Sequence, residues 1–84
     1  MTTDTLKVVC SADGVATITF NRPDKLNTLS IRLRQELDAA VRALAADAAN
    51  RVLIITGNGR AFTAGLDLDE WETPGLVAAG GLAA

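Results

Sequence analysis

The sequence predicts one small α/β domain, in which a β-hairpin is followed by a helix and then by an apolar strand. Three observations support this fold class. Apolar and polar residues alternate in residues 6–10 and 15–20, which is the period of a strand. Apolar residues then recur every three or four positions from Leu33 to Leu44, which is the period of a helix. Residues 52–56 form an uninterrupted apolar run, and this favours a parallel strand reached through the helix.

The two alternating segments at the N-terminus are predicted to pair as a hairpin. Asp13 and Gly14 lie between them, and glycine takes the positive φ that a tight hairpin turn requires. Pro23 follows the second segment and has no N–H for a strand ladder, so we expect the strand to end before it.

The helix is expected to begin after Ser30, a favourable N-cap residue, and to run through Ala49 to a stop at Asn50. The charged side chains within it are expected on a solvated surface. Its apolar side chains share one face, and they are Leu33, Leu37, Val41 and Leu44.

The remaining elements are predicted from apolar and acidic runs. Residues 52–56 show no alternation, which predicts a strand covered on both faces. Residues 67–72 have the acidic bias of a helix start, so a short helix that contains Trp71 is expected there. Residues 75–84 are uncharged and rich in glycine and alanine, and they are predicted to form a frayed tail or, alternatively, the start of an incomplete helix without its packing partner.

Composition excludes several classes of function. The formal charge of −2 over 84 residues provides no basic surface for nucleic acid. The chain has no histidine and a single cysteine, Cys10, so Ser-His-Asp hydrolysis, a disulfide within the chain and most zinc sites are excluded. No run approaches the roughly 20 apolar residues of a membrane span, and we expect a cytoplasmic protein without a membrane partner. Catalysis would have to use carboxylates or the backbone.

The glycine turn in residues 61–68 is the candidate functional motif. It lies between an apolar strand and an expected helix start, where backbone N–H groups can be aimed at an anion. The phosphate-loop and dinucleotide fingerprints are absent, and the acidic residues after the turn lack calcium-loop spacing, so no metal is expected. Backbone donors could stabilise the oxyanion of an acyl thioester. An ordinary strand-to-helix connection fits the same residues, and spacing alone leaves both interpretations open.

Four segments in order resemble the crotonases, the enoyl-CoA hydratase/isomerase superfamily. They are residues 15–23, 27–29, 51–57 and 59–68, within a resemblance that covers roughly residues 6–72. The resemblance implies the opening ββα turns of a crotonase-like spiral, with an incomplete fold. Residues 1–74 would form a partial crotonase-like domain, and residues 75–84 an apolar tail rich in glycine and alanine.

The resemblance also implies a substrate site. By position, the backbone N–H of Leu66 matches the first oxyanion-hole donor of the family. Lys25 and Leu26 match a stretch that lies near CoA, although a plain turn with a solvated lysine also accounts for these two residues. The loop that lines the acyl-CoA site is matched by Ala64, Gly65, Leu66, Asp67 and Leu68, in which Asp67 is expected to hold the loop in shape.

The family supplies its second oxyanion donor and its acid/base carboxylates from later segments that this sequence does not include. The resemblance therefore implies a protein of fatty-acid metabolism that acts on acyl-CoA thioesters, with CoA as part of the substrate and no other cofactor. The chain alone is expected to be truncated and inactive, and it could associate with crotonase-like subunits. The alternatives are a non-catalytic fragment that binds CoA or docks on another subunit, and a remnant that aggregates through its exposed strand edge.

Overall fold

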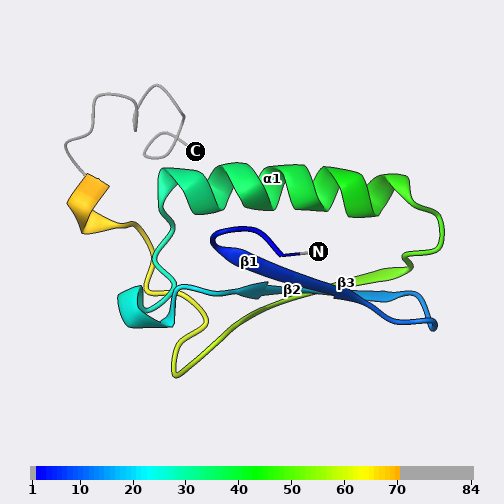
Figure 1. The fold of residues 1–84 in the computed structure, drawn as a ribbon, viewed down its shortest axis with the longest axis horizontal. Helices are drawn as coiled ribbons and strands as arrows, with labels where there is room; N and C mark the ends of the chain where they lie inside the picture. Colours follow the sequence, from blue (N-terminus) through cyan, green and yellow to red (C-terminus); the bar gives the residue numbers. More distant parts are fainter. Residues whose placement is uncertain (1, 71–84) are drawn as a thin grey trace.

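A computed structural model describes residues 2–70 of the chain. One helix lies against one face of a three-stranded sheet of order β1-β2-β3 (Figure 1). The helices and strands are β1 (Leu6–Cys10), β2 (Val15–Phe20), a 3-10 helix (Pro23–Lys25), α1 (Ile31–Ala46), β3 (Val52–Gly57) and a second 3-10 helix (Leu68–Glu70). None of the helices in residues 2–70 is long and apolar enough to cross a membrane. The predicted α/β class is confirmed.

The N-terminal hairpin forms as predicted. β1 and β2 pair antiparallel from Leu6 opposite Phe20 to Cys10 opposite Ala16. Gly14 has φ +85°, the left-handed region that the predicted hairpin turn required. Its carbonyl also accepts hydrogen bonds from the backbone N–H groups of Arg51 and Val52, so the same turn fixes the start of β3.

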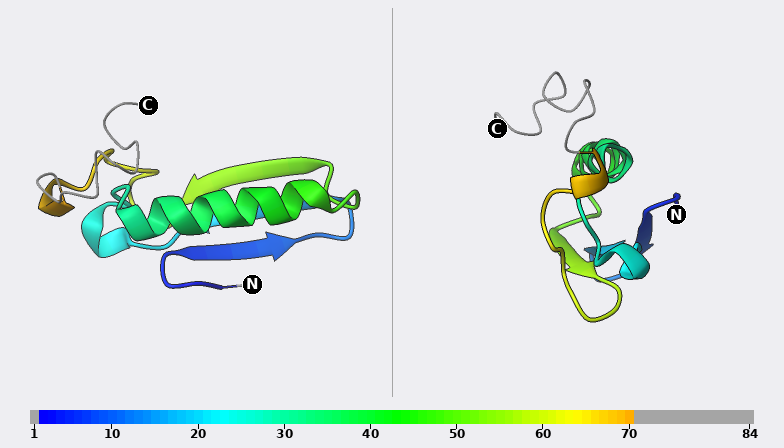
Figure 2. Two further views of the ribbon diagram at one scale, coloured as in Figure 1. Left: turned by 90° about the horizontal axis from the view of Figure 1, so that it is seen from above. Right: turned by 90° about the vertical axis from the view of Figure 1, so that its left-hand side faces the viewer.

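The predicted parallel pairing of β2 with β3 is also confirmed, in a register from Val15 opposite Val52 to Phe20 opposite Gly57. Seen from above, α1 runs along the sheet with β1 and β3 on either side of it (Figure 2). The core lies between this helix and the inner face of the sheet. It consists of Leu6, Val8, Ala16, Ile18, Phe20, Leu33, Ala40 and Leu44.

α1 ends at Ala46, three residues before the predicted end at Ala49. Asp47 leaves the helical conformation with ψ 112°, and its carboxylate accepts a hydrogen bond from the N–H of Ala49. Asn50, the expected stop, donates its side-chain amide to the carbonyl of Leu44 and so satisfies one of the last helical acceptors. Alanine favours the helix, but local side-chain bonds to the backbone end it earlier.

β3 was expected to be covered on both faces, and that prediction is wrong for the described chain. Val52, Ile54 and Ile55 are 51%, 46% and 40% exposed. β3 pairs only with β2, and of its side chains only Leu53 packs against the core. An apolar run indicates that a strand is suited to burial, but burial also requires a second packing layer of helices or strands on its other face.

Within the described residues, the acidic segment forms the 3-10 turn Leu68–Glu70, and the end of the helix expected over residues 67–72 lies outside them. Trp71 and the tail at residues 75–84 lie outside the described residues, so the division between residues 1–74 and 75–84 stays a prediction. The charged residues of α1 are not all on a solvated surface. Glu36 is partly buried and accepts hydrogen bonds from Thr3 and Thr5.

Candidate functional site

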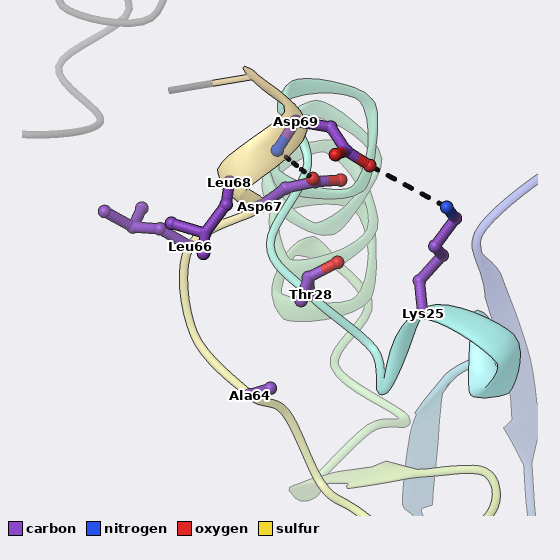
Figure 3. Close-up of a pocket in the computed structure, with 7 residues that line it drawn as sticks. All are labelled: Lys25, Thr28, Ala64, Leu66, Asp67, Leu68 and Asp69. Atoms are coloured by element: carbon purple, nitrogen blue, oxygen red, sulfur yellow. Dashed lines mark hydrogen bonds and ion pairs between the residues drawn. The ribbon is translucent and has the colours of Figure 1, made fainter. Parts of the chain in front are cut away.

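A hollow of about 250 Å³ opens beside the loops that follow β2 and β3, near the start of α1 (Figure 3). Its walls come from the end of the first 3-10 helix with the residues just after it, and from residues 64–69, about forty positions further along the sequence. The lining residues are Lys25, Thr28, Ala64, Leu66, Asp67, Leu68 and Asp69. Five of the seven predicted site residues are therefore brought together in one hollow.

The other two predicted residues, Leu26 and Gly65, do not line the hollow. They shape it through their backbones. The Leu26 carbonyl accepts a hydrogen bond from the Ala64 N–H at 3.0 Å, and the Gly65 carbonyl accepts one from the Leu29 N–H at 2.7 Å. Together with the parallel bridge between Leu29 and Leu66, these bonds lay the glycine turn against the loop that precedes α1.

The backbone amides of the glycine turn have different partners. The Ala64 N–H is bonded to Leu26, and the Gly65 N–H donates to Thr63 Oγ1 at 3.1 Å. Within residues 2–70, the Leu66 N–H donates no hydrogen bond. Gly65 has φ +92°, a conformation that favours glycine over other residues. Leu66 lines the hollow, so the turn leaves the backbone N–H of this wall residue open to a ligand.

Asn27 connects the loops beneath the hollow, and its side chain is fully buried. Its amide donates to the carbonyls of Asn58 and Ala61 at 2.9 and 2.8 Å, and its Oδ1 accepts from the Arg22 N–H at 2.8 Å. The Asn27 carbonyl accepts from Thr63 Oγ1 at 2.7 Å. One residue therefore ties three segments together. No local sequence pattern predicts this role for Asn27, which was noted only within the family-like segment of residues 27–29.

Asp67 is 8% exposed and both of its carboxylate oxygens are engaged. Oδ2 pairs with the Arg22 guanidinium at 3.2 Å, and Oδ1 accepts from the Asp69 N–H at 3.0 Å. Arg22 Nη1 also donates to the carbonyl and hydroxyl oxygens of Thr28. In this arrangement Asp67 acts as a structural group that fixes the turn.

Lys25 and Asp69 face each other across the mouth of the hollow (Figure 3). Their charged atoms are 3.7 Å apart, and the side chains are 53% and 78% exposed, so water screens the pair. The Lys25 ammonium remains accessible to an anionic ligand. Thr28 and Asp69 line the hollow but were not among the predicted site residues, because only folding brings them beside residues 64–68.

The hollow combines a free backbone N–H, an accessible cation and the apolar side chains of Leu66 and Leu68. A carbonyl oxygen that gains negative charge suits the N–H, and a charged group further along the same ligand suits the lysine. No three metal-ligating side chains cluster in the described part of the chain.

Comparison with known proteins identifies the family. The enoyl-CoA hydratase/isomerase family profile matches residues 11–80. The chain belongs to the enoyl-CoA hydratase/isomerase family. It is similar to hydroxycinnamoyl-CoA hydratase-lyase of Pseudomonas fluorescens, with 44% identity over 59 residues, which is 70% of this chain and 21% of that protein. It is also similar to 4-chlorobenzoyl coenzyme A dehalogenase-2 of an Arthrobacter species, with 45% identity over 58 residues, or 69% and 21% of the two proteins.

Solved structures of the family have the same fold. An enoyl-CoA hydratase/isomerase from Mycobacterium paratuberculosis superposes with a TM-score of 0.79 and 43% identity, over 86% of this chain and 27% of that one. The crotonase-like fold predicted from the sequence is therefore confirmed, and it is incomplete in this chain. The chain spans about a fifth of the length of the two curated relatives.

Proposed function

We propose that this chain binds the thioester end of an acyl-CoA and that the Leu66 N–H donates a hydrogen bond to the thioester carbonyl. The observation that carries the proposal is the Leu66 amide, which has no acceptor within residues 2–70 although the amides of Ala64 and Gly65 are both bonded. Membership of a family that acts on acyl-CoA in general supports the choice of ligand.

The chemistry of this family makes such a donor useful. Adding water to an enoyl thioester, or removing a proton beside the carbonyl, places negative charge on the carbonyl oxygen. A preorganised N–H stabilises that charge, and removing one such donor typically lowers the rate about 10²–10³-fold. Lys25, exposed at the mouth of the hollow, supplies positive charge for the phosphates of CoA.

We also propose that the chain by itself does not turn over enoyl-CoA. The titratable side chains of the hollow are Lys25, Asp67 and Asp69. Asp67 is held on both oxygens, and Asp69 is largely exposed beside Lys25. None of them provides the buried acid/base pair that hydration of a double bond requires.

Calorimetry with butyryl-CoA and with free CoA tests the binding proposal. Leu66→Pro removes the N–H, which has no partner in the described chain, and should abolish the extra affinity for butyryl-CoA over CoA. Leu66→Ala keeps the N–H and should retain that difference. Equal affinity of the original chain for the two ligands would contradict the donor role.

Incubation with crotonyl-CoA tests the second proposal, that the chain alone does not turn over enoyl-CoA. A loss of enoyl absorbance that Leu66→Pro abolishes would contradict it.

A further inference from the structure

We infer that Thr63 is a positioning residue, whose hydroxyl group holds the Leu66 N–H in the orientation that a carbonyl ligand needs. That a carbonyl ligand uses this orientation rests on the proposed function. That Thr63 restricts the backbone at Leu66 concerns the ligand-free protein and is tested separately.

The Thr63 hydroxyl makes two hydrogen bonds at once. It donates to the Asn27 carbonyl at 2.7 Å, and it accepts from the Gly65 N–H at 3.1 Å. The peptide group that carries the Leu66 N–H begins at the Gly65 carbonyl, which accepts from the Leu29 N–H. Gly65 is therefore held on both sides, by Thr63 at its N–H and by Leu29 at its carbonyl.

Asn27, whose carbonyl accepts the Thr63 hydrogen bond, is itself held firmly in place. Asn27 is fully buried and bonded through its side chain to Arg22, Asn58 and Ala61. Thr63 thus links the Gly65 N–H to this buried residue and adds to the bond at the Gly65 carbonyl, which restricts glycine, the residue with the greatest conformational freedom. In the part of the chain that the structure describes, no atom within 4 Å of the position of a Cβ on Gly65 restrains the turn from that side.

Two substitutions of Thr63 distinguish the effect of its hydroxyl group from the effect of its side-chain shape. Thr63→Val keeps the branched shape and loses both hydrogen bonds, whereas Thr63→Ser keeps the hydroxyl. Thr19→Val is a matched control, because Thr19 is also half-buried and its side chain has no hydrogen bond within residues 2–70.

The first measurement uses the ligand-free, ¹⁵N-labelled chain. We expect the backbone order parameter of Leu66 to fall from roughly 0.85 to below about 0.6 in Thr63→Val, and to stay high in Thr63→Ser and Thr19→Val. An unchanged Leu66 order parameter in Thr63→Val would overturn the inference. So would a fall of the same size in Thr19→Val, or a failure of serine to restore order.

The second measurement adds butyryl-CoA labelled with ¹³C at the thioester carbonyl. The carbonyl resonance should shift on binding to the original chain and to Thr63→Ser, and the shift should be lost in Thr63→Val, with affinity roughly 5-fold lower. Affinity for free CoA should not change. If the original chain binds no butyryl-CoA while Thr63→Val still loosens Leu66, the proposed function fails and the positioning role stands. A full carbonyl shift in Thr63→Val would overturn the inference.

Discussion

Asn27 illustrates how a single buried side chain organises the candidate site. Its amide group makes three hydrogen bonds to the backbones of Arg22, Asn58 and Ala61, at sequence separations of 5, 31 and 34 residues. Both Leu26 and Asn27 have positive φ, at 51° and 53°. Asparagine tolerates that conformation better than most residues, and the three bonds compensate for the strain.

Replacing Asn27 with alanine should therefore be strongly destabilising. The change leaves two carbonyls and one N–H without partners in a buried place, at about 1–3 kcal/mol for each unsatisfied group before relaxation. We expect the free energy of unfolding, measured in urea, to fall by about 3 kcal/mol or the chain to unfold outright. Asn58→Ala is the control, because the one hydrogen bond of its side chain within residues 2–70 is made to Asn21 at an exposed place. Equal losses in the two variants would contradict the central role of Asn27.

Gly57 and Gly65 are glycines for two different reasons, lack of space for a side chain at Gly57 and a positive φ at Gly65. A Cβ on Gly57 would lie 2.5 Å from the carbonyl oxygens of Ala61 and Phe62, which are backbone atoms that cannot easily move. A Cβ on Gly65 would meet no atom of residues 2–70 within 4 Å, but a residue with a Cβ would be strained at its φ of +92°. Gly65→Ala should cost about 1–2 kcal/mol, and Gly57→Ala clearly more. Thermal unfolding of both variants checks which substitution is more destabilising. A larger loss of stability in Gly65→Ala would show that the backbone around Gly57 moves to make room for the added Cβ.

At the scale of elements, α1 is fixed at its start by contacts from three parts of the chain. Ser30 Oγ accepts from the Leu33 N–H, and Glu70 Oε1 accepts from the Ile31 N–H at 2.7 Å. Glu36, one turn later, accepts from the hydroxyl groups of Thr3 and Thr5. The residues just before β1 and the turn after the glycine motif are therefore both joined to the helix.

Glu36 makes this arrangement sensitive to acid. Burial acts to raise the pKa of its carboxyl group, but the hydrogen bonds from Thr3 and Thr5 and the charge of Arg32 outweigh it, so the pKa lies below its ordinary value of 4.5. The carboxylate therefore contributes stability above pH 4.5, and that contribution is lost as the pH falls through the lowered folded pKa. Glu36→Gln should reduce stability at pH 7 and flatten its decline below pH 4.5.

Urea unfolding between pH 2.5 and pH 7 measures this effect. Asp38→Asn is the matched control, because Asp38 lies on the same helix and, among the described residues, pairs only with Arg42 at an exposed place. If Asp38→Asn flattened the decline of stability below pH 4.5 as much as Glu36→Gln, the contacts of Glu36 with Thr3 and Thr5 would not be the source of that decline.

At the scale of the whole molecule, the main unsatisfied feature is β3. In the sheet formed by residues 2–70 it is an edge strand without a charged side chain, and Val52 and Ile54 are each about half exposed. Natural edge strands of this kind usually carry a lysine, a proline or a cover that prevents pairing with another chain. We therefore expect the 84-residue chain to self-associate at high concentration.

Ile54→Lys places a charge on the exposed edge strand and should delay this association. Light scattering against concentration should show a smaller apparent mass than for the original chain. Ala12→Lys adds the same charge in the exposed hairpin turn and should have little effect. If both variants reduced scattering equally, net charge and not the β3 edge would control association.

The sequence by itself determined the hairpin, the start and apolar face of α1, the parallel pairing of β3 and the family, because each depends on short-range periodicity, turn chemistry or a local motif. The tertiary structure decided where α1 ends, how exposed β3 is and which residues complete the hollow. Thr28 and Asp69 join the hollow, and Asn27 and Thr63 support it, through contacts between segments far apart in the sequence. No local pattern encodes such contacts, since burial and hydrogen bonding at those positions exist only once the segments have packed together.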